Sequence, residues 1–324
     1  MWSLLLVAMA GRAYAHEGVV LPWDSDELDY ATASPDAWMA LDLHVSVVLG
    51  IATFCGLYWR AVTRWRVRYG WSDVPVERWR VIAFALGQVV LFASLNGPVH
   101  HLSDYYLFTA HMVQHLLLNL LWAPLTVLAL PPWLVEAALR VPWVKRVSDF
   151  FADLRVKFLA YNGALYLWHV PFMYDLALRV HNAHIVEHLM FMGTAVIAWF
   201  GLLCTAPSLP RPSRIVQLLY LFLMTLPMKL LGAIISLTEG IIYTGYSEAP
   251  RIWGISPQQD QGWGGLLMWL PGGLVLWASM IYIFVQWVRE ERASSEAEVA
   301  RVMASQSGGA PLPADVPPLR LLKP

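Results

Sequence analysis

Two pairs of histidines lie in apolar stretches of the sequence, each with a spacing of four residues. His111 and His115 form one pair, and His184 and His188 form the other. On a helix, residues four apart share one face, so each pair presents two imidazoles side by side. Imidazole is a good ligand for copper, zinc, iron and nickel. If the two helices face each other, the pairs converge on one metal ion or on two close ions.

Each pair taken alone also suits a simpler interpretation, in which the histidines make hydrogen bonds between helices. A polar ring nitrogen without a partner in hydrocarbon costs a few kcal/mol, so ionisable residues within a membrane are functional candidates. Thioether ligands favour Cu(I) over Cu(II), although core packing is the simpler role for each methionine. The further candidate ligands are His44, His169, Met112, Met173, Met190 and Met192.

Several other polar residues accompany the histidines. Glu187 lies next to His188, and we expect it either to orient a ligand imidazole or to hydrogen-bond between helices. Asp260 and Gln261 begin the last apolar segment, where Asp260 either caps that helix or reaches the histidines. Lys229 lies deep in another segment, where it snorkels, pairs with a carboxylate or acts directly. The two cysteines have no paired spacing typical of zinc or redox sites.

The composition indicates which elements position these residues. The 324 residues are 58% hydrophobic and only 14% charged, with a mean hydropathy of +0.51, whereas soluble domains are about 45–50% apolar and about 25% charged. The sequence therefore predicts an all-α, polytopic membrane helix bundle. The net charge of −1 and the lack of a basic stripe argue against nucleic-acid binding. Seven transmembrane helices of about 20 residues are expected, at 38–59, 79–99, 105–130, 155–176, 183–205, 214–242 and 263–288.

The two ends of the chain lie outside this predicted domain of residues 38–288. Residues 1–15 end in an A-x-A pattern typical of a cleaved signal peptide, and the alternative is an uncleaved first membrane segment. Residues 16–37 are then a periplasmic N-terminal segment. Residues 289–324 are polar and rich in Ser, Ala, Glu and Pro, which predicts a disordered cytoplasmic tail.

Lysine and arginine set the orientation. They concentrate after the first and third apolar segments and in the tail, whereas the opposite side of the mature chain carries only Arg179 and Arg251. The bias predicts the N-terminus outside, the C-terminus inside and a bacterial inner membrane location. All ten histidines then fall in the outer half of the protein. Those nearest the outer surface are loop histidines or a point where metal enters, namely His16, His100, His101 and His181.

Three motifs carry a family resemblance. In order along the chain, "HMVQHLLLNLLWAPLTVLALP", "LYLWHVPFMYDLALRVHNAHIVEHLMFMGTAVIAWF" and "QQDQGWGGLLMWLPGG" resemble blocks of the CtaG family of cytochrome c oxidase assembly factors. This is the polytopic family, distinct from the single-span copper chaperone of the same name, which uses cysteine ligands. The motif positions are occupied by His111, His115, His169, His184, Glu187, His188, Asp260 and Gln261.

The resemblance implies an integral membrane protein that helps to make an active haem-copper oxidase, by delivering copper to it. The implied partners are cytochrome c oxidase subunits, periplasmic copper chaperones and membrane lipid. Delivery makes and breaks no bond in a substrate, so we expect no enzyme. The alternatives are a haem-binding membrane redox protein, a copper transporter, and a scaffold for oxidase assembly. The sequence makes no prediction of the oligomeric state.

Overall fold

The computed structural model describes residues 43–71 and 73–306. Within these ranges every regular element is a helix and no strand is present, as the composition predicts. Six helical segments are long and apolar enough to cross a membrane, which indicates a multi-pass membrane protein. The predicted signal peptide, the predicted periplasmic segment and His16 lie outside the described residues.

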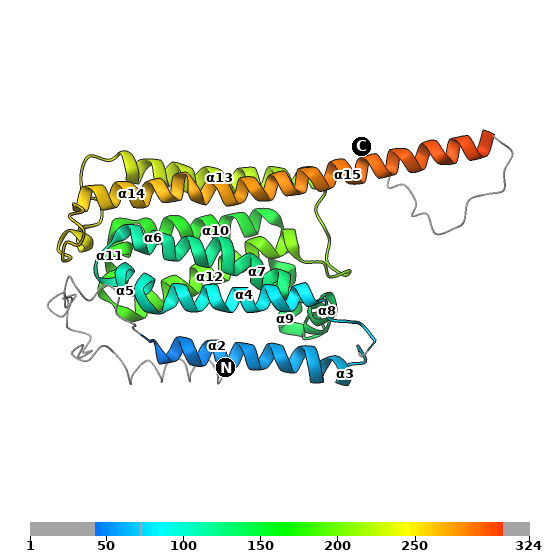
Figure 1. Cartoon of the computed structure of the whole chain (residues 1–324), viewed down its shortest axis with the longest axis horizontal. Coiled ribbons are helices and arrows are strands. Elements are labelled where there is room, and N and C mark those ends of the chain that lie inside the picture. Colours follow the sequence, from blue (N-terminus) through cyan, green and yellow to red (C-terminus); the bar gives the residue numbers. More distant parts are fainter. Residues whose placement is uncertain (1–42, 72, 307–324) are drawn as a thin grey trace.

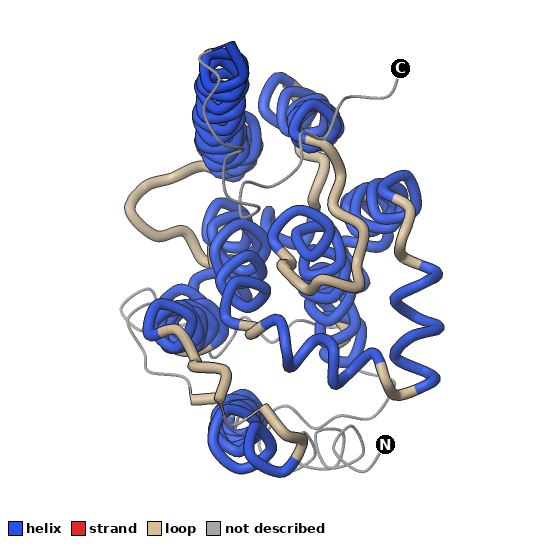
Figure 2. Tube along the Cα trace, turned by 90° about the vertical axis from the view of Figure 1, so that its right-hand side faces the viewer, coloured by secondary structure: helices blue, strands red, loops and turns tan. Residues whose placement is uncertain are grey.

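The six segments run side by side as a bundle (Figure 1; Figure 2). The first three are Val45–Arg68 (α2 Val45–Arg60, the π-helical turn η2 Ala61–Trp65 and α3 Arg66–Arg68), Arg78–Tyr105 (α4 Arg78–Leu95 and α5 Gly97–Tyr105) and Phe108–Ala129 (α6 Phe108–Leu117, the π-helical turn η3 Leu118–Trp122 and α7 Ala123–Ala129). The next two are single helices, α12 His181–Leu203 and α13 Arg214–Leu237. The last is Pro257–Met303, which spans α14 Pro257–Trp269 and most of α15 Pro271–Gln306. The shorter elements are α8 Pro132–Leu139, α9 Pro142–Phe150, α10 Leu154–His169, α11 Pro171–Arg179 and the 3₁₀ turn η4 Thr244–Ser247.

The predicted span at 155–176 accounts for the difference between seven expected spans and six found. Pro171 divides this segment into α10 and α11, with Val170 in an extended conformation between them, because a residue before proline disfavours helical angles. The 16 residues of α10 rise about 24 Å, less than the hydrocarbon core of about 30 Å. The length and composition of α10 therefore fall short of a full span, although the helix packs inside the bundle between α12 and α13.

The helices differ in how deeply they are buried. In Figure 1, α6 lies in the middle of the molecule, with α13, α14 and α15 on one side and α4 and α2 on the other. In the most apolar 18 residues of Phe108–Ala129, 61% of the residues are buried, compared with 6% in Val45–Arg68. A side chain on α6 is thus surrounded by protein, whereas most of α2 is exposed to the surroundings of the bundle.

Two glycines allow α13 and α14 to approach each other closely. A Cβ on Gly265 of α14 would lie 2.6 Å from the backbone nitrogen of Ser236, and a Cβ on Gly232 of α13 would lie 2.7 Å from the carbonyl oxygen of Gly265. Small residues at such contacts let helix backbones pack directly against each other in membranes. The contact fixes the position of α14, which carries Asp260 and Gln261 near its start.

The C-terminal tail corrects one prediction. We expected disorder over residues 289–324, but α15 continues as a helix to Gln306 (Figure 1). Residues 307–324 lie outside the described residues. Glu290 makes a two-point ion pair with Arg214 at the start of α13, with distances of 2.5 and 3.1 Å. The stretch that follows is rich in alanine, glutamate and arginine, which are good helix formers.

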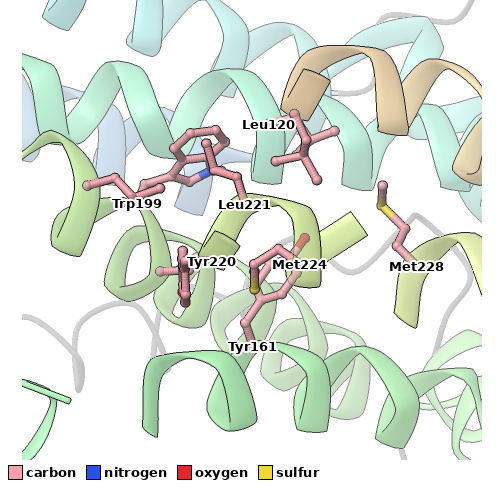
Figure 3. Close-up of a pocket in the computed structure, with 10 residues that line it drawn as sticks. Leu120, Tyr161, Trp199, Tyr220, Leu221, Met224 and Met228 are labelled. Carbon is pink, nitrogen blue, oxygen red and sulfur yellow. The ribbon is translucent and has the colours of Figure 1, made fainter. Parts of the chain in front are cut away.

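The middle of the bundle is closely packed. One small cavity of about 20 Å³ lies among η3, α10, α12, α13 and α15 (Figure 3), roughly the space that one water molecule needs. Its lining is aromatic and aliphatic, with the thioethers of Met224 and Met228. These methionines therefore belong to the apolar core rather than to the histidine-bearing end.

Candidate metal centre

The first histidine pair lies on the buried helix α6. The rings of His111 and His115 have centroids 4.4 Å apart, and their Nε2 atoms are 2.5 Å apart. Both residues are buried. Two ring nitrogens at this separation repel each other unless a proton or a cation lies between them.

The second pair, on α12, faces the first. The rings of His184 and His188 are 4.5 Å apart. Across the helices, His115 stacks on His188 at 5.0 Å, and His111 lies 5.6 Å from His184. The four-residue spacing places each pair on one face of its helix, and the packing of α6 against α12 brings the two faces together, which the sequence analysis had left open.

Glu187 lies within the same group. Its side-chain Oε1 is 3.5 Å from Nε2 of His115 and 3.8 Å from Nε2 of His111, and the residue is only 1% exposed. One ligand atom from each of His111, His184 and Glu187 lies within 4.8 Å of the others. The carboxylate is thus placed as a candidate ligand itself, closer than the supporting role that we expected. We refer to His111, His115, His184, Glu187 and His188 as the His/Glu cluster.

Unpartnered atoms indicate that the His/Glu cluster suits a cation. Five of its buried nitrogen and oxygen atoms have no hydrogen-bond partner, namely Nδ1 of His115, Nε2 of His184, Oε2 of Glu187 and both ring nitrogens of His188. A buried polar atom without a partner costs about 1–3 kcal/mol, so five together are a substantial destabilisation. A metal ion would accept lone pairs from several of these atoms at once, and imidazole with carboxylate is a common ligand set.

Tyr246 on η4 orients the ring of His111, and the sequence analysis missed it. Its hydroxyl donates to the carbonyl oxygen of Ser103 at 2.5 Å and lies 3.0 Å from Nδ1 of His111. Because the one hydroxyl proton is used by Ser103, Nδ1 of His111 is the donor in this second bond. Nε2 of His111 is then unprotonated and faces His115 and Glu187, as a ligand nitrogen would.

Asp260 supports the centre through the backbone. Its carboxylate accepts hydrogen bonds from the N–H groups of Phe108 and Thr109, at 2.8 and 2.9 Å. It therefore caps α6, whereas we expected it to cap its own helix or to reach the histidines. Ser256 caps α14 instead, in a capping box with Gln259.

Gln261 and Lys229 lie away from the His/Glu cluster. Gln261 accepts a hydrogen bond from the backbone of Ile242 at 2.6 Å and donates to Gly240 at 3.0 Å, which holds the loop before η4. Lys229 places its ammonium 5.0 Å from the ring centre of Trp277, and it makes no ion pair with a described residue. It therefore has an aromatic partner rather than the carboxylate that we considered.

His169 lies near the cluster but packs differently. Its Nδ1 donates to the carbonyl oxygen of Leu165 at 2.7 Å, so Nε2 carries no proton. Nε2 is buried without a hydrogen-bond partner. The ring packs on Tyr174 and Phe191, at 6.3 and 6.2 Å, so His169 lies behind Phe191 rather than against the histidine rings.

His100 borders the His/Glu cluster, and the candidate ligand His44 lies next to His100. The rings of His44 and His100 are 4.4 Å apart, and His100 lies 6.3 Å from His184. His100 also contacts Asp104 at 3.3 Å and Gln114 at 3.0 Å. The acidic residue four positions after His100 is a signal that the sequence contained and that we did not use.

The remaining candidates lie elsewhere. His101 packs on Tyr105 and Tyr106, at 5.0 and 5.5 Å, and His181 is exposed at the start of α12. The predicted soft ligands are core residues: Met112 is buried beside Gly264 of α14, and Met173 and Met192 pack on the main core. The donor atoms gathered in the His/Glu cluster are therefore nitrogen and oxygen.

Comparison with known proteins identifies the family. The chain matches the family described as "Cytochrome c oxidase caa3 assembly factor (Caa3_CtaG)" over residues 56–290. It is 24% identical over 263 residues to an uncharacterized protein of Mycobacterium leprae, covering 76% of this chain and 38% of that protein. An uncharacterized protein of Mycobacterium bovis is 23% identical over 242 residues, covering 68% of this chain and 35% of that one.

The chain thus spans less than two fifths of the length of these relatives. No solved structure matches it. The family match covers all five residues of the His/Glu cluster, together with Tyr246 and Asp260. The chain belongs to the CtaG family of assembly factors for cytochrome c oxidase caa3.

Proposed function

We propose that this protein binds copper at the His/Glu cluster and helps to deliver it to a cytochrome c oxidase. The observation that carries the proposal is the set of five buried, unpartnered polar atoms on two facing helices. An assembly factor of a copper-containing enzyme that has a buried ligand set is suited to hold the metal before transfer. Delivery by exchange of ligands needs no catalytic residue, in keeping with a role that is not enzymatic.

The ligands at the cluster are compatible with both oxidation states of copper. The thioethers in the sequence led us to expect Cu(I), but the donors that gather at the cluster are imidazole and carboxylate. Imidazole suits both oxidation states, and carboxylate suits harder ions. We therefore propose copper as the metal, retain Cu(I) as the form delivered, and test Cu(II) and zinc beside it.

The proposed topology has seven spans in a bacterial inner membrane, with α10 and α11 together as the fourth. The N-terminus is then outside and the C-terminus inside, and the His/Glu cluster faces the periplasm. His44 and His100 form a route along which metal from a periplasmic chaperone reaches His184. His101 and His181 lie off this route because their rings pack elsewhere or are exposed.

Two of the three alternative functions, haem binding and copper transport, have less support, and the metal analysis described below tests the third, a scaffold without a metal. Haem ligation needs a flat slot for the macrocycle between axial ligands, whereas the cluster rings pack at 4.4 to 6.3 Å from one another. Transport needs a polar route through the bundle, whereas the mid-bundle cavity is small and apolar (Figure 3).

Metal analysis of the purified protein tests the proposal. After loading with Cu(I), Cu(II) or zinc and removal of excess metal, the wild type should retain close to one copper ion per chain. The double variant His111→Ala with His188→Ala should lose it. The matched control is His101→Ala with His181→Ala, which leaves the cluster intact. Equal copper in the two double variants would refute a metal site at the cluster.

A further inference from the structure

A second cavity, of about 300 Å³, lies at the opposite end of the bundle from the His/Glu cluster. It opens beneath the hairpin of α8 and α9, beside the start of α10 and the end of α12. Its lining is almost entirely apolar and includes Leu134, Val147, Val196, Ile197 and Phe200. No step of the proposed function uses this cavity.

One charged side chain lines the cavity. Lys157 is only 7% exposed, and its ammonium makes no hydrogen bond or ion pair with any described residue. The ammonium lies directly over Gly201 of α12, where a Cβ would approach to 2.6 Å. An isolated charge in apolar surroundings is costly, and buried charges are normally paired. The cavity thus holds a cation whose counterion is not supplied by residues 43–71 or 73–306.

The nearby acidic residues are engaged elsewhere. Asp149 pairs with Lys145 at 2.8 Å, and Asp153 pairs with Arg155 at 2.6 Å. Glu136 accepts a hydrogen bond from the backbone of Ser208 at 2.9 Å. None of these three carboxylates pairs with Lys157, so a ligand that is both anionic and apolar enough to cover the lining would supply the missing counterion.

The hairpin also has the character of a helix that lies in a membrane surface. In α9, Trp143 and Phe150 are 68% and 65% exposed, and Lys145 and Arg146 follow Trp143. Exposed aromatic residues next to basic ones are typical of helices that lie at the boundary of headgroups and acyl chains. Lipid therefore has direct access to the cavity that this helix covers.

We propose that the cavity binds one anionic phospholipid. The phosphate pairs with the ammonium of Lys157, and an acyl chain lies along Val196, Ile197 and Phe200. Because α12 rises about 1.5 Å per residue, Val196 lies about 7.5 Å deeper in the bundle than Gly201. That direction leads from the headgroup level toward the hydrocarbon, as the two parts of a phospholipid require. Free phosphate would pair with Lys157 but would leave the apolar lining uncovered.

The test measures lipid that stays with the purified protein. The full chain is exchanged into detergent, and bound phosphatidylglycerol and phosphatidylethanolamine are counted by native mass spectrometry. The wild type should retain about one phosphatidylglycerol and should melt at a higher temperature when this lipid is added. Lys157→Met should lose both effects, whereas the control Arg292→Met, which removes an exposed charge on α15 away from the cavity, should keep them. Equal retention in Lys157→Met, equal retention of the two lipids, or the same protection from inorganic phosphate would overturn the proposal.

A second pair of variants tests the cavity without changing charge. Ala138 lines it, whereas the neighbouring Ala137 does not. Ala138→Trp should fill the space and expel the lipid, and Ala137→Trp should retain it. Lipid retained by both tryptophan variants would contradict the proposed site. These measurements need no copper, so their outcome is independent of the metal proposal.

Discussion

The helices α6 and α12 each contribute a histidine pair to the His/Glu cluster, but they hold the rings in different ways. On α6, His111 is fixed by Tyr246, and the start of the helix is fixed by Asp260. On α12, Nε2 of His184 and both ring nitrogens of His188 have no partner, and the helix start has no side-chain cap. Contacts within the protein therefore fix the ring of His111 on α6, whereas the ring nitrogens on α12 would gain partners only from a bound ion.

This difference suits the proposed function, in which the site must release the metal that it binds. A rigid half keeps the donor atoms in place, and an adaptable half allows ligands to leave one after another. Variants that loosen the α6 side should therefore have the largest effects, and variants of residues at the edge of the cluster should have smaller ones.

Removing the cap of α6 should have the largest effect. Asp260→Ala leaves two buried N–H groups without acceptors, which should lower the stability by about 3 kcal/mol. Thermal melting in detergent measures this loss of stability. Asp260→Asn keeps one acceptor oxygen, so its melting temperature should lie between those of Asp260→Ala and the wild type. An unchanged melting temperature in Asp260→Ala would show that α6 is not held in this way.

Neutralising the carboxylate of the cluster should weaken the metal site next. Glu187→Gln keeps the volume but removes the charge, and copper affinity should fall by roughly 100-fold, the upper end for a carboxylate that supports metal-bound histidines. Competition with a copper chelator measures the affinity. Glu136→Gln, at the opposite end of the bundle, is the control and should bind as the wild type does. Similar affinities for both variants would exclude Glu187 from the site.

Releasing the ring of His111 should have a smaller effect. Tyr246→Phe removes the hydroxyl that fixes the tautomer, and copper affinity should fall by roughly 10-fold. Tyr243→Phe is a matched control in the same loop, because the Tyr243 hydroxyl donates to the carbonyl oxygen of His169 and makes no hydrogen bond to a ring of the His/Glu cluster. If both variants lose affinity equally, the loop as a whole, and not the hydrogen bond, supports the site.

The outermost histidine on α12 should have the smallest effect. His181 is exposed and precedes His184 by less than one turn, so His181→Ala should leave copper affinity within about twofold of the wild type.

His100→Ala should slow copper loading without changing the final copper content, since His100 borders the cluster. Stopped-flow loading separates the two variants, and equal rates would remove His100 from the proposed route.

Much of this arrangement could be predicted from the sequence, because it depends on local periodicity. Histidines four residues apart share a helix face, and apolar length predicts helical spans. The orienting contacts could not be predicted: Tyr246 is 135 residues from His111, and Asp260 is 152 residues from Phe108. Such contacts depend on how a loop and a helix terminus approach another helix, which spacing alone does not encode.

The division of the predicted span at 155–176 into α10 and α11 could not be predicted from spacing either. Pro171 was visible in the sequence, but whether a proline kinks a span or divides it depends on the packing of the flanking turns. Here the chain extends at Val170, and a predicted single span becomes two helices. The helix beyond Arg289, where we expected disorder, also depends on a contact distant in sequence, because Arg214 on another helix pairs with Glu290.

The close glycine contact between α13 and α14 also determines which parts can move. Because α14 is pressed against α13 and carries the cap of α6, these three helices form a single mechanical unit. The amides of Phe108 and Thr109 should then exchange with deuterium only when this unit opens as a whole. If the cluster binds copper as proposed, we expect the motion that exposes the ion to occur in α11 and α12, which lie outside this unit.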